Sequence, residues 1–482
     1  MAEIATTVFL LLVVGCAMKD RVQLENPEPP SSFSQVGEAE WADRWWTEFH
    51  DSQLDLQVEV ALGRNFPLDG ARHRMEAARE LARIEGAELS LQLDGGAELG
   101  SAFNTNGPNV NGLATGLNAS IPVDLWGEIR SRVDAQWLRA SAAQADRDVI
   151  ALVLAADVSV TWMSLIEAHA QAALLKEQLE TNSTGLKLQE ARFGLGQIRS
   201  ADVLRQRQLV EGTRQQAIAV TARIEILEHQ LAVLQGLPPQ EAVFDPGDQL
   251  PDLPPIPYTG LPAQLLNRRP DIQRDYLALW AADQDWASAV SRQYPRLDLV
   301  ASLQTTAESP EDLFRDWSGA LAGQLLAPLL NGGRLRADVR RNEAIVRERF
   351  TDFSQTVLLA YRDVENALVT EQYQIQQIEQ LELQAELAHQ SSLQLREQYL
   401  IGDVEYLDVL SSITQEQSLR RQTLSARLDL ITNRIALYLA LAGGFDDIER
   451  CPELIDIVPD AKQREHSPPE VFLISHPSAR DE

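Results

Sequence analysis

The sequence predicts a mainly helical protein with a small β component, built from an internal repeat. Three observations predict this class: two long proline-free stretches, short alternating apolar segments, and residues that match between the two halves. None of the 23 prolines falls between Pro122 and Pro238 or between Pro328 and Pro452. Because proline disrupts helix interiors, both stretches are predicted to form long helices.

Each proline-free stretch is predicted to fold as a helical hairpin, because a short glycine-containing segment interrupts it near its middle. These segments are 192–196 and 398–402, and the predicted hairpins span 127–236 and 333–442. Apolar residues recur at the α-helical period in the second stretch, which predicts nearly straight amphipathic helices. They are Val346, Phe350, Phe353, Val357, Tyr361, Val364 and Leu368.

The two halves of the chain match at an offset of 206 residues, which indicates a structural repeat. The matches are Pro122 with Pro328, Gly127 with Gly333, Arg130 with Arg336, Phe193 with Tyr399, Gly196 with Gly402, and 202–204 with 408–410. Upstream, Leu68 matches Ile272 and Leu93 matches Leu297 at an offset of 204. The second half therefore has a loop that is two residues longer. The predicted repeats are 16–260 and 261–444.

Segments of alternating apolar residues precede both helical stretches and predict two β-hairpins, at about 88–123 and 294–328. The alternating positions are Leu89, Leu91, Leu93, Leu113, Thr115, Leu117, Ala119, Ile121 and Val123, then Leu297, Leu299, Ala301, Leu303, Ala320, Ala322, Gln324 and Leu326. A single hairpin of this kind would fit a soluble sheet. Two of them, each followed by helical hairpins of about 70–90 Å, fit a soluble enzyme poorly.

Composition and motifs exclude several classes of function. The formal charge is −29, which disfavours nucleic-acid binding. Two cysteines and seven scattered histidines predict neither a disulfide framework nor a metal site. The sequence lacks the phosphate-binding loop, the serine nucleophile elbow and the zinc-protease helix motif. We therefore expect no enzyme activity and no cofactor.

The amino terminus resembles a bacterial lipoprotein signal. Residues 4–15 form an apolar segment too short to span a bilayer, and Cys16 follows Gly15. This pattern predicts a signal peptide at 1–15 and acyl chains on Cys16, although the segment before it lacks Lys and Arg; the alternative is an ordinary buried cysteine. No later run of 18 apolar residues predicts a membrane-spanning helix, so a membrane role would need β-strands.

In the order of its motifs, the chain resembles the TolC-type outer membrane efflux proteins, particularly the lipoprotein branch that serves multidrug pumps. The resemblance covers about 45–444. It is carried by 45–49 (WWTEF), 122–127 (PVDLWG), 267–272 (NRRPDI), 294–297 (YPRL), both turns leading into Asp-Val-Leu, and 437–444 (LYLALAGG). Leu91 departs from the pattern, because the second half has Pro295 at the matching position.

The resemblance implies a TolC-like α/β barrel formed by a homotrimer. Four strands per chain would close a 12-stranded barrel in the outer membrane lipid, and the long helices would form a cylinder across the periplasm. The expected function is the exit duct of a tripartite pump for small molecules such as drugs or other toxic compounds, with a periplasmic adaptor and an inner-membrane transporter as partners. The alternatives are a protein-secretion duct and, in another class, a periplasmic coiled-coil scaffold or adaptor.

The predicted functional positions lie at the two helical tips. Asp202, Leu407, Asp408 and Ser411 are the candidate gate residues, because three copies of two aspartates would gather carboxylates at one end. The alternative role for the aspartates is helix capping. Gly194, Gly196 and Gly402 are the candidate adaptor contacts.

Aromatic residues and the tail complete the expectations. Trp45 and Trp46 are expected to pack in a core beside the long helices, whereas Trp126 and Trp317 flank strands and are expected at a membrane interface. The tail 445–482 is expected to be a partly disordered extension.

Overall fold

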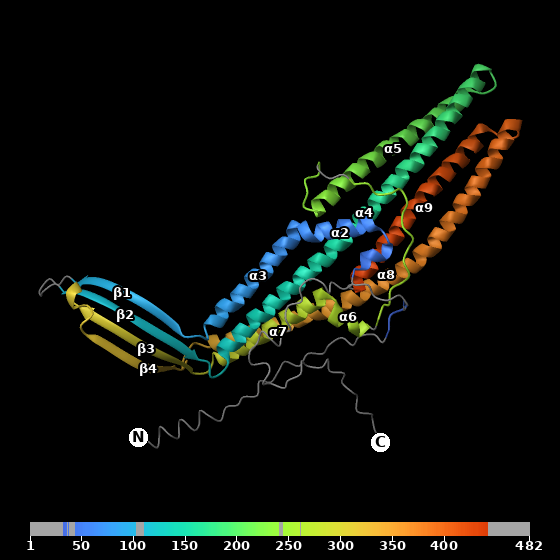
Figure 1. The fold of residues 1–482 in the computed structure, drawn as a ribbon. Helices are drawn as coiled ribbons and strands as arrows, with labels where there is room; N and C mark the ends of the chain where they lie inside the picture. Colours follow the sequence, from blue (N-terminus) through green and yellow to red (C-terminus); the bar gives the residue numbers. More distant parts are fainter. Residues whose placement is uncertain are drawn as a thin grey trace, which may run out of the picture.

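The protein is an elongated molecule with a β-sheet at one end and two helical tips at the other (Figure 1). The computed structural model describes residues 32–35, 37, 44–102, 110–240, 244–260 and 262–441. The predicted signal peptide, Cys16 and the tail 445–482 lie outside these residues. The predicted class, mainly helical with a few antiparallel strands, is confirmed.

The helices are arranged around four long members. The described elements are η1 (Trp45–Phe49), α2 (Ser52–Arg64), α3 (Phe66–Ala87), α4 (Glu128–Gly194), α5 (Ser200–Leu234), α6 (Pro262–Arg268), α7 (Pro270–Ser291), η2 (Pro310–Asp312), α8 (Arg334–Ile401) and α9 (Tyr406–Leu441). At 1.5 Å per residue, α4 and α8 are each about 100 Å long. The two predicted helical hairpins are therefore formed by α4 with α5 and by α8 with α9.

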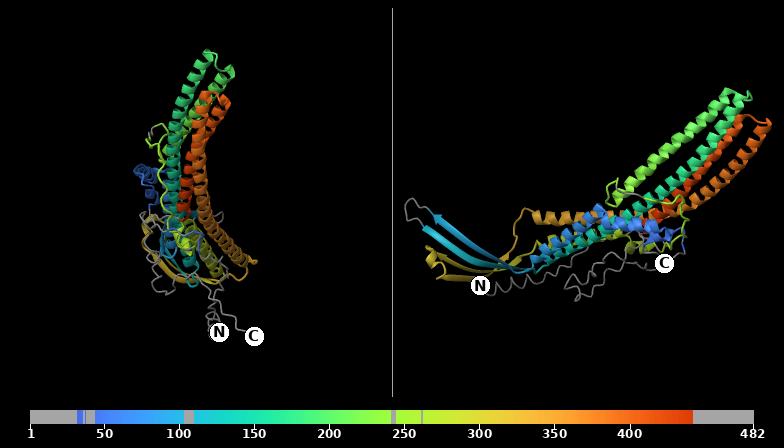
Figure 2. Two further views of the ribbon diagram at one scale, coloured as in Figure 1. Left: turned by 90° about the vertical axis from the view of Figure 1, so that its right-hand side faces the viewer. Right: turned by 45° about the horizontal axis from the view of Figure 1, so that its top comes forward.

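The long helices lie side by side in one curved layer, in the order α5, α4, α9, α8 (Figure 2). Helix α4 packs against both α5 and α9, and α9 packs against α8. Helices α5 and α8 consequently form the two edges of the layer.

The internal repeat is visible in the bounds of the elements. Helices α3 and α7 begin and end exactly 204 residues apart, while α4 and α8, like α5 and α9, begin 206 residues apart. Gly127 and Gly333, which precede α4 and α8, both have a left-handed backbone, with φ of 72° and 82°. The two offsets inferred from sequence thus describe the fold.

Four antiparallel strands form one sheet in the order β1 (Gln92–Ala102), β2 (Val110–Val123), β3 (Arg296–Ala307) and β4 (Trp317–Leu326). The middle pair joins the two repeats, with Leu117 opposite Leu303. One expectation is corrected: Leu89 and Leu91 lie before β1, because α3 continues to Ala87 and a turn follows it. Strands β1 and β4 are the edges of the sheet.

The main apolar core lies halfway along the molecule, where η1 and α2 pack on α4 and α9. Trp45 and Trp46 are buried there, as expected, and the Trp45 ring stacks on Tyr438 with centroids 5.4 Å apart. Trp162 joins the same core, and its indole nitrogen donates to the Asp51 carboxylate at 2.7 Å. This core joins the N-terminal segment to both hairpins.

One described helix, α4, is long and apolar enough to cross a membrane by length and composition. Two thirds of its most apolar window is buried inside the protein, as in a core helix. Within the described residues, the sheet is therefore the better candidate for contact with lipid.

Candidate functional site

The sheet has one continuous apolar face, which follows from its register. Side chains alternate between the faces along each strand, and residues paired across strands share a face. The pairing places Leu93 with Ala119, Ala119 with Ala301, and Ala301 with Leu321. This face is formed mainly by Leu93, Ala97, Leu99, Leu113, Leu117, Ala119, Ile121, Val123, Leu297, Leu299, Ala301, Leu303, Trp317, Leu321 and Leu325.

Two threonines lie on the apolar face, and the hydroxyl group of each is satisfied locally. Thr115 donates to the backbone carbonyl of Gly96 at 3.0 Å, and Thr305 donates to that of Leu313 at 2.5 Å. Neither hydroxyl group requires water, so the face is suited to an apolar environment.

The opposite face of the sheet is polar and carries acidic side chains. Its polar members are Gln92, Asp94, Glu98, Asn118, Ser120, Arg296, Asp298, Ser302, Gln304, Ser318 and Gln324. Arg296 pairs with Asp298 at 2.9 Å. Strands of 10 to 14 residues are long enough to cross a bilayer, so the sheet can separate lipid on one side from water on the other.

Aromatic side chains lie near both ends of the strands. At the end near the helices, Trp126 stacks on Tyr294 with ring centroids 4.9 Å apart and donates to the Pro295 carbonyl at 2.8 Å. At the far end, Phe314 and Trp317 lie 6.3 Å apart. This arrangement agrees with the interfacial positions expected for Trp126 and Trp317.

The turns at the helical tips depend on two of the three predicted glycines. Gly196 and Gly402 have φ of 72° and 86°, a conformation that favours glycine, and their amides close the turns on the Phe193 and Tyr399 carbonyls. Gly194 is the last residue of α4 and is absent from the positive-φ glycines. All three have open space at the position of a Cβ, so backbone conformation, rather than crowding, constrains Gly196 and Gly402.

The predicted gate residues lie close to these turns but differ in their contacts. Asp202, in the first turn of α5, pairs with Arg205 at 3.3 Å, and α5 has no side-chain cap, so capping is not its role. Leu407 and Asp408 are exposed at the start of α9. The Ser411 hydroxyl donates to the Asp408 backbone carbonyl at 3.0 Å.

Sequence reasoning missed a cluster that joins the two tips, which we call the tip clamp: Gln189, Arg192, Gln206, Tyr399 and Tyr406. The buried Tyr406 hydroxyl donates to the Gln206 amide oxygen, and Tyr399 donates to that of Gln189 at 3.3 Å. The Arg192 guanidinium lies over the Tyr399 ring, 4.7 Å from its centroid. Burial raises the pKa of Tyr406 to about 12, so this hydroxyl stays a hydrogen-bond donor at neutral pH.

Below the clamp, α4 presents buried amides to its neighbours instead of apolar side chains. They are Gln171, Gln178, Asn182 and Gln189, spaced by 7, 4 and 7 residues. Asn182 and Gln417 exchange side-chain hydrogen bonds of 3.2 and 3.0 Å. The spacing was visible in the sequence, but amides at these positions read equally well as a solvated helix face.

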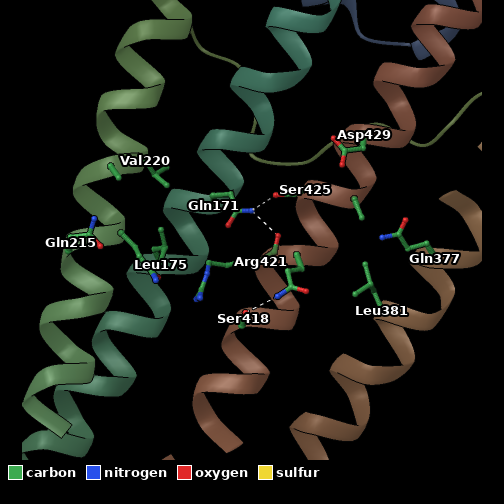
Figure 3. A pocket seen from close by; sticks show the side chains of 14 residues that line it. Gln171, Leu175, Gln215, Val220, Gln377, Leu381, Ser418, Arg421, Ser425 and Asp429 are labelled. Atoms are coloured by element: carbon green, nitrogen blue, oxygen red, sulfur yellow. Dashed lines mark hydrogen bonds between the residues drawn. The ribbon is translucent and has the colours of Figure 1, made fainter. Parts of the chain in front are cut away.

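A groove of about 520 Å³ opens beside these amides, lined by residues of all four long helices. Figure 3 shows Gln171 reaching from α4 to α9, where its amide donates to the Arg421 carbonyl at 2.9 Å and to the Ser425 hydroxyl. Among the described residues, no group of three or more His, Cys, Asp or Glu side chains is placed to hold a metal ion.

Comparison with known proteins places the chain among outer membrane channels. The family model described as "Outer membrane efflux protein" matches residues 58–237 and 261–443. The chain is 30% identical over 341 residues to the pyoverdine export outer membrane protein OpmQ of Pseudomonas aeruginosa, which covers 67% of this chain and 71% of OpmQ. It is 26% identical over 457 residues to the cation efflux system protein CusC of Escherichia coli, which covers 90% of this chain and 97% of CusC.

Solved structures share the fold. The outer-membrane channel OprN superimposes with a TM-score of 0.81 at 24% identity, over 88% of this chain and 98% of OprN. The CmeC outer membrane channel of Campylobacter jejuni gives 0.82 at 21% identity, over 89% of this chain and 95% of CmeC.

Proposed function

The chain belongs to the outer membrane efflux protein family, and we propose that three copies of it form the exit duct of a tripartite pump that exports small molecules. It is an outer membrane efflux channel with a long periplasmic helical portion. The relatives' names include pyoverdine export, cation efflux and a toluene efflux pump, so we expect a cargo of small molecules or ions.

The two-faced sheet is the observation that carries this proposal. An open sheet with free edges is unstable in lipid, because each unpaired backbone group costs several kcal/mol. Strands β1 and β4 each have one free edge within the chain. Closure by three copies would pair every edge, turn the apolar face to lipid and enclose the polar face around a water-filled duct.

The helical layer supports the same assembly. Helices α5 and α8 form its edges and carry exposed apolar side chains, including Ile218 and Ile226 on α5 and Leu383 and Leu387 on α8. Contact between α5 of one copy and α8 of the next would cover these residues and extend the layer into a cylinder. Acyl chains on Cys16 would add an anchor in the same membrane.

The tips are the proposed gate and the proposed adaptor contact. Asp202, Leu407, Asp408 and Ser411 lie at or beside the turns, and three copies would bring them around one opening. Gly194, Gly196 and Gly402 lie farthest from the sheet, where a periplasmic adaptor would reach them (Figure 1). We infer a passive duct without enzyme activity, so that the inner-membrane transporter supplies the energy.

The function is tested by transport in cells. Deleting the gene should increase the intracellular accumulation of a fluorescent pump substrate, and the intact chain expressed with its own adaptor and transporter should restore export. A matched strain with an inactive transporter controls for leakage through the duct. Restored secretion of a protein, without any effect on dye accumulation, would instead favour the secretion duct.

A further inference from the structure

The free edges of β1 and β4 can be matched residue by residue, because the internal repeat fixes how they meet. This inference rests on the proposed assembly of identical copies, but not on the cargo. Within one chain, β2 of the first repeat pairs with β3 of the second repeat. In a ring of copies, β4 meets β1 of the next copy in the equivalent way, as the end of one repeat against the start of another.

The register already observed tests the two repeat offsets. Strand β1 corresponds to β3 at an offset of 204, and β2 corresponds to β4 at 206. The pair Gln92 with Ser120 should therefore recur as Arg296 with Leu326, and these two residues are partners in β3 and β4. Hydrogen-bonded geometry thus supports the offsets independently of residue identity.

The same offsets convert the pairing inside the chain into a pairing between chains. Asn118 lies opposite Ser302. Moving Asn118 forward by 206 gives Gln324, and moving Ser302 back by 204 gives Glu98. We propose that β4 pairs antiparallel with β1 of a second copy in the register that places Gln324 opposite Glu98 of the partner subunit.

This register matches the chemistry of both faces. Gln324 and Glu98 lie on the polar face, where the Gln324 amide can donate to the carboxylate of the partner subunit's Glu98. On the apolar face, Leu325 lies opposite Ala97 of the partner subunit. A slip by one residue would place the apolar residues of β4 beside the polar residues of β1, so the faces exclude it.

The register also gives a partner to a leucine that is highly exposed in the single chain. Leu329, just after β4, is 88% exposed, and Leu93 in β1 is 61% exposed. The pair Val123 with Leu297 becomes Leu329 with Leu93 of the partner subunit under the same offsets. Burial of apolar surface at this point would strengthen the seam between copies.

The repeat is imperfect beside this seam. Inside the chain, the Trp126 indole donates to the Pro295 carbonyl, whereas Gly332 stands at the position equivalent to Trp126 and Leu91 at that of Pro295. The seam between copies therefore lacks the indole hydrogen bond and relies on the strand pairing and the leucines.

Disulfide cross-linking of the full chain tests the register. Glu98→Cys and Gln324→Cys are combined in a Cys451→Ser background and oxidised in isolated outer membranes. Directly opposite residues have Cα atoms about 4.5–5.5 Å apart, which suits a disulfide. The matched control combines Gln324→Cys with Asp94→Cys, which lies four residues along β1, about 13 Å away.

The first pair should run as covalent dimers and trimers on denaturing non-reducing gels, and the control pair should remain monomeric. Gly323→Cys with Leu99→Cys, on the apolar face, gives a second pair in the same register and should also cross-link. Preferential cross-linking of the control pair, or monomeric products from both matched pairs in variants that form native trimers, would overturn the register. Loss of trimers in unmodified protein would instead refute the proposed assembly, while absent transport with correct cross-links would refute only the function.

Discussion

At the scale of single residues, backbone conformation decides what the tip glycines contribute. Gly196 and Gly402 adopt positive φ, whereas Gly194 ends a helix without it. The sequence places all three beside a turn, but it cannot separate the one that merely occupies the last helical position from the two that make the turn possible.

Replacing Gly402 by Asp should weaken the tip without preventing assembly. A non-glycine residue in the left-handed region costs about 1–2 kcal/mol, which should displace the turn and reduce coupling to the pump. Gly194→Ala is the matched control, because alanine is favoured over glycine in a helix by about 0.5–1 kcal/mol. Trimer content on native gels should be unchanged for both variants, while dye export should fall only for Gly402→Asp. Equal export by both variants would contradict this assignment.

Asp408 should influence ions that pass the tip. Its side chain is exposed and makes no printed bond with the described residues, so Asp408→Asn removes charge without removing a contact. We expect a lower preference for cations in planar bilayers and an unchanged melting temperature. Asp352→Asn removes the same charge from α8 far from the tip and should leave selectivity unchanged. A reduced melting temperature with unchanged selectivity would assign Asp408 a structural role.

At the scale of elements, buried polar contacts join the two hairpins over much of their length. Periodicity in the sequence predicted the long helices, and the paired glycines predicted both turns. The tip clamp and the buried amides were not predicted, because Tyr406 and Gln206 lie 200 residues apart and meet only when both hairpins are folded. The proposed roles of Asp202, Leu407 and Ser411 and the domain boundary at 260 stay predictions.

Loss of the Tyr406 hydroxyl should loosen the tip clamp. In Tyr406→Phe the buried Gln206 amide oxygen loses its donor, at a cost of about 1–3 kcal/mol, while the aromatic ring is kept. We expect a higher open probability of single channels and greater uptake of a bulky antibiotic. Tyr373→Phe changes an exposed tyrosine on α8 and serves as the control. Unchanged gating in Tyr406→Phe would show that this bond does not hold the tips together.

The buried pair of Arg434 and Glu371 should be essential to the α8 and α9 hairpin. Two guanidinium nitrogens of Arg434 donate to the carboxylate of Glu371 at 2.9 and 2.6 Å, and a third contacts the carbonyls of Pro254 and Pro255. Arg434→Met leaves a buried carboxylate unpaired, which should cost about 3–5 kcal/mol. Thermal unfolding in detergent should show this loss, and the double variant Arg434→Met with Glu371→Leu should recover part of it. No recovery would mean that the proline carbonyls are the more important partners.

At the scale of the whole molecule, one sheet must satisfy two solvents at once. Its apolar and polar faces follow from alternation along the strands, which the sequence shows, and from the register between strands, which becomes clear only in the fold. Long-range pairing between β2 and β3 is what joins the two repeats into a single surface. Neighbouring positions in one strand consequently have opposite requirements.

Adjacent residues of β4 give the sharpest test of this division. Leu321 belongs to the apolar face and Ala320 to the polar face. Leu321→Arg should place a guanidinium in the hydrocarbon, at about 2–4 kcal/mol per copy near the bilayer midplane, so three copies should prevent stable insertion. Ala320→Arg should insert and assemble, because its side chain would point into the water-filled duct, and should mainly reduce cation conductance. Membrane fractionation and native gels compare the two variants. If Ala320→Arg failed to insert while Leu321→Arg assembled normally, the two faces would have to be exchanged.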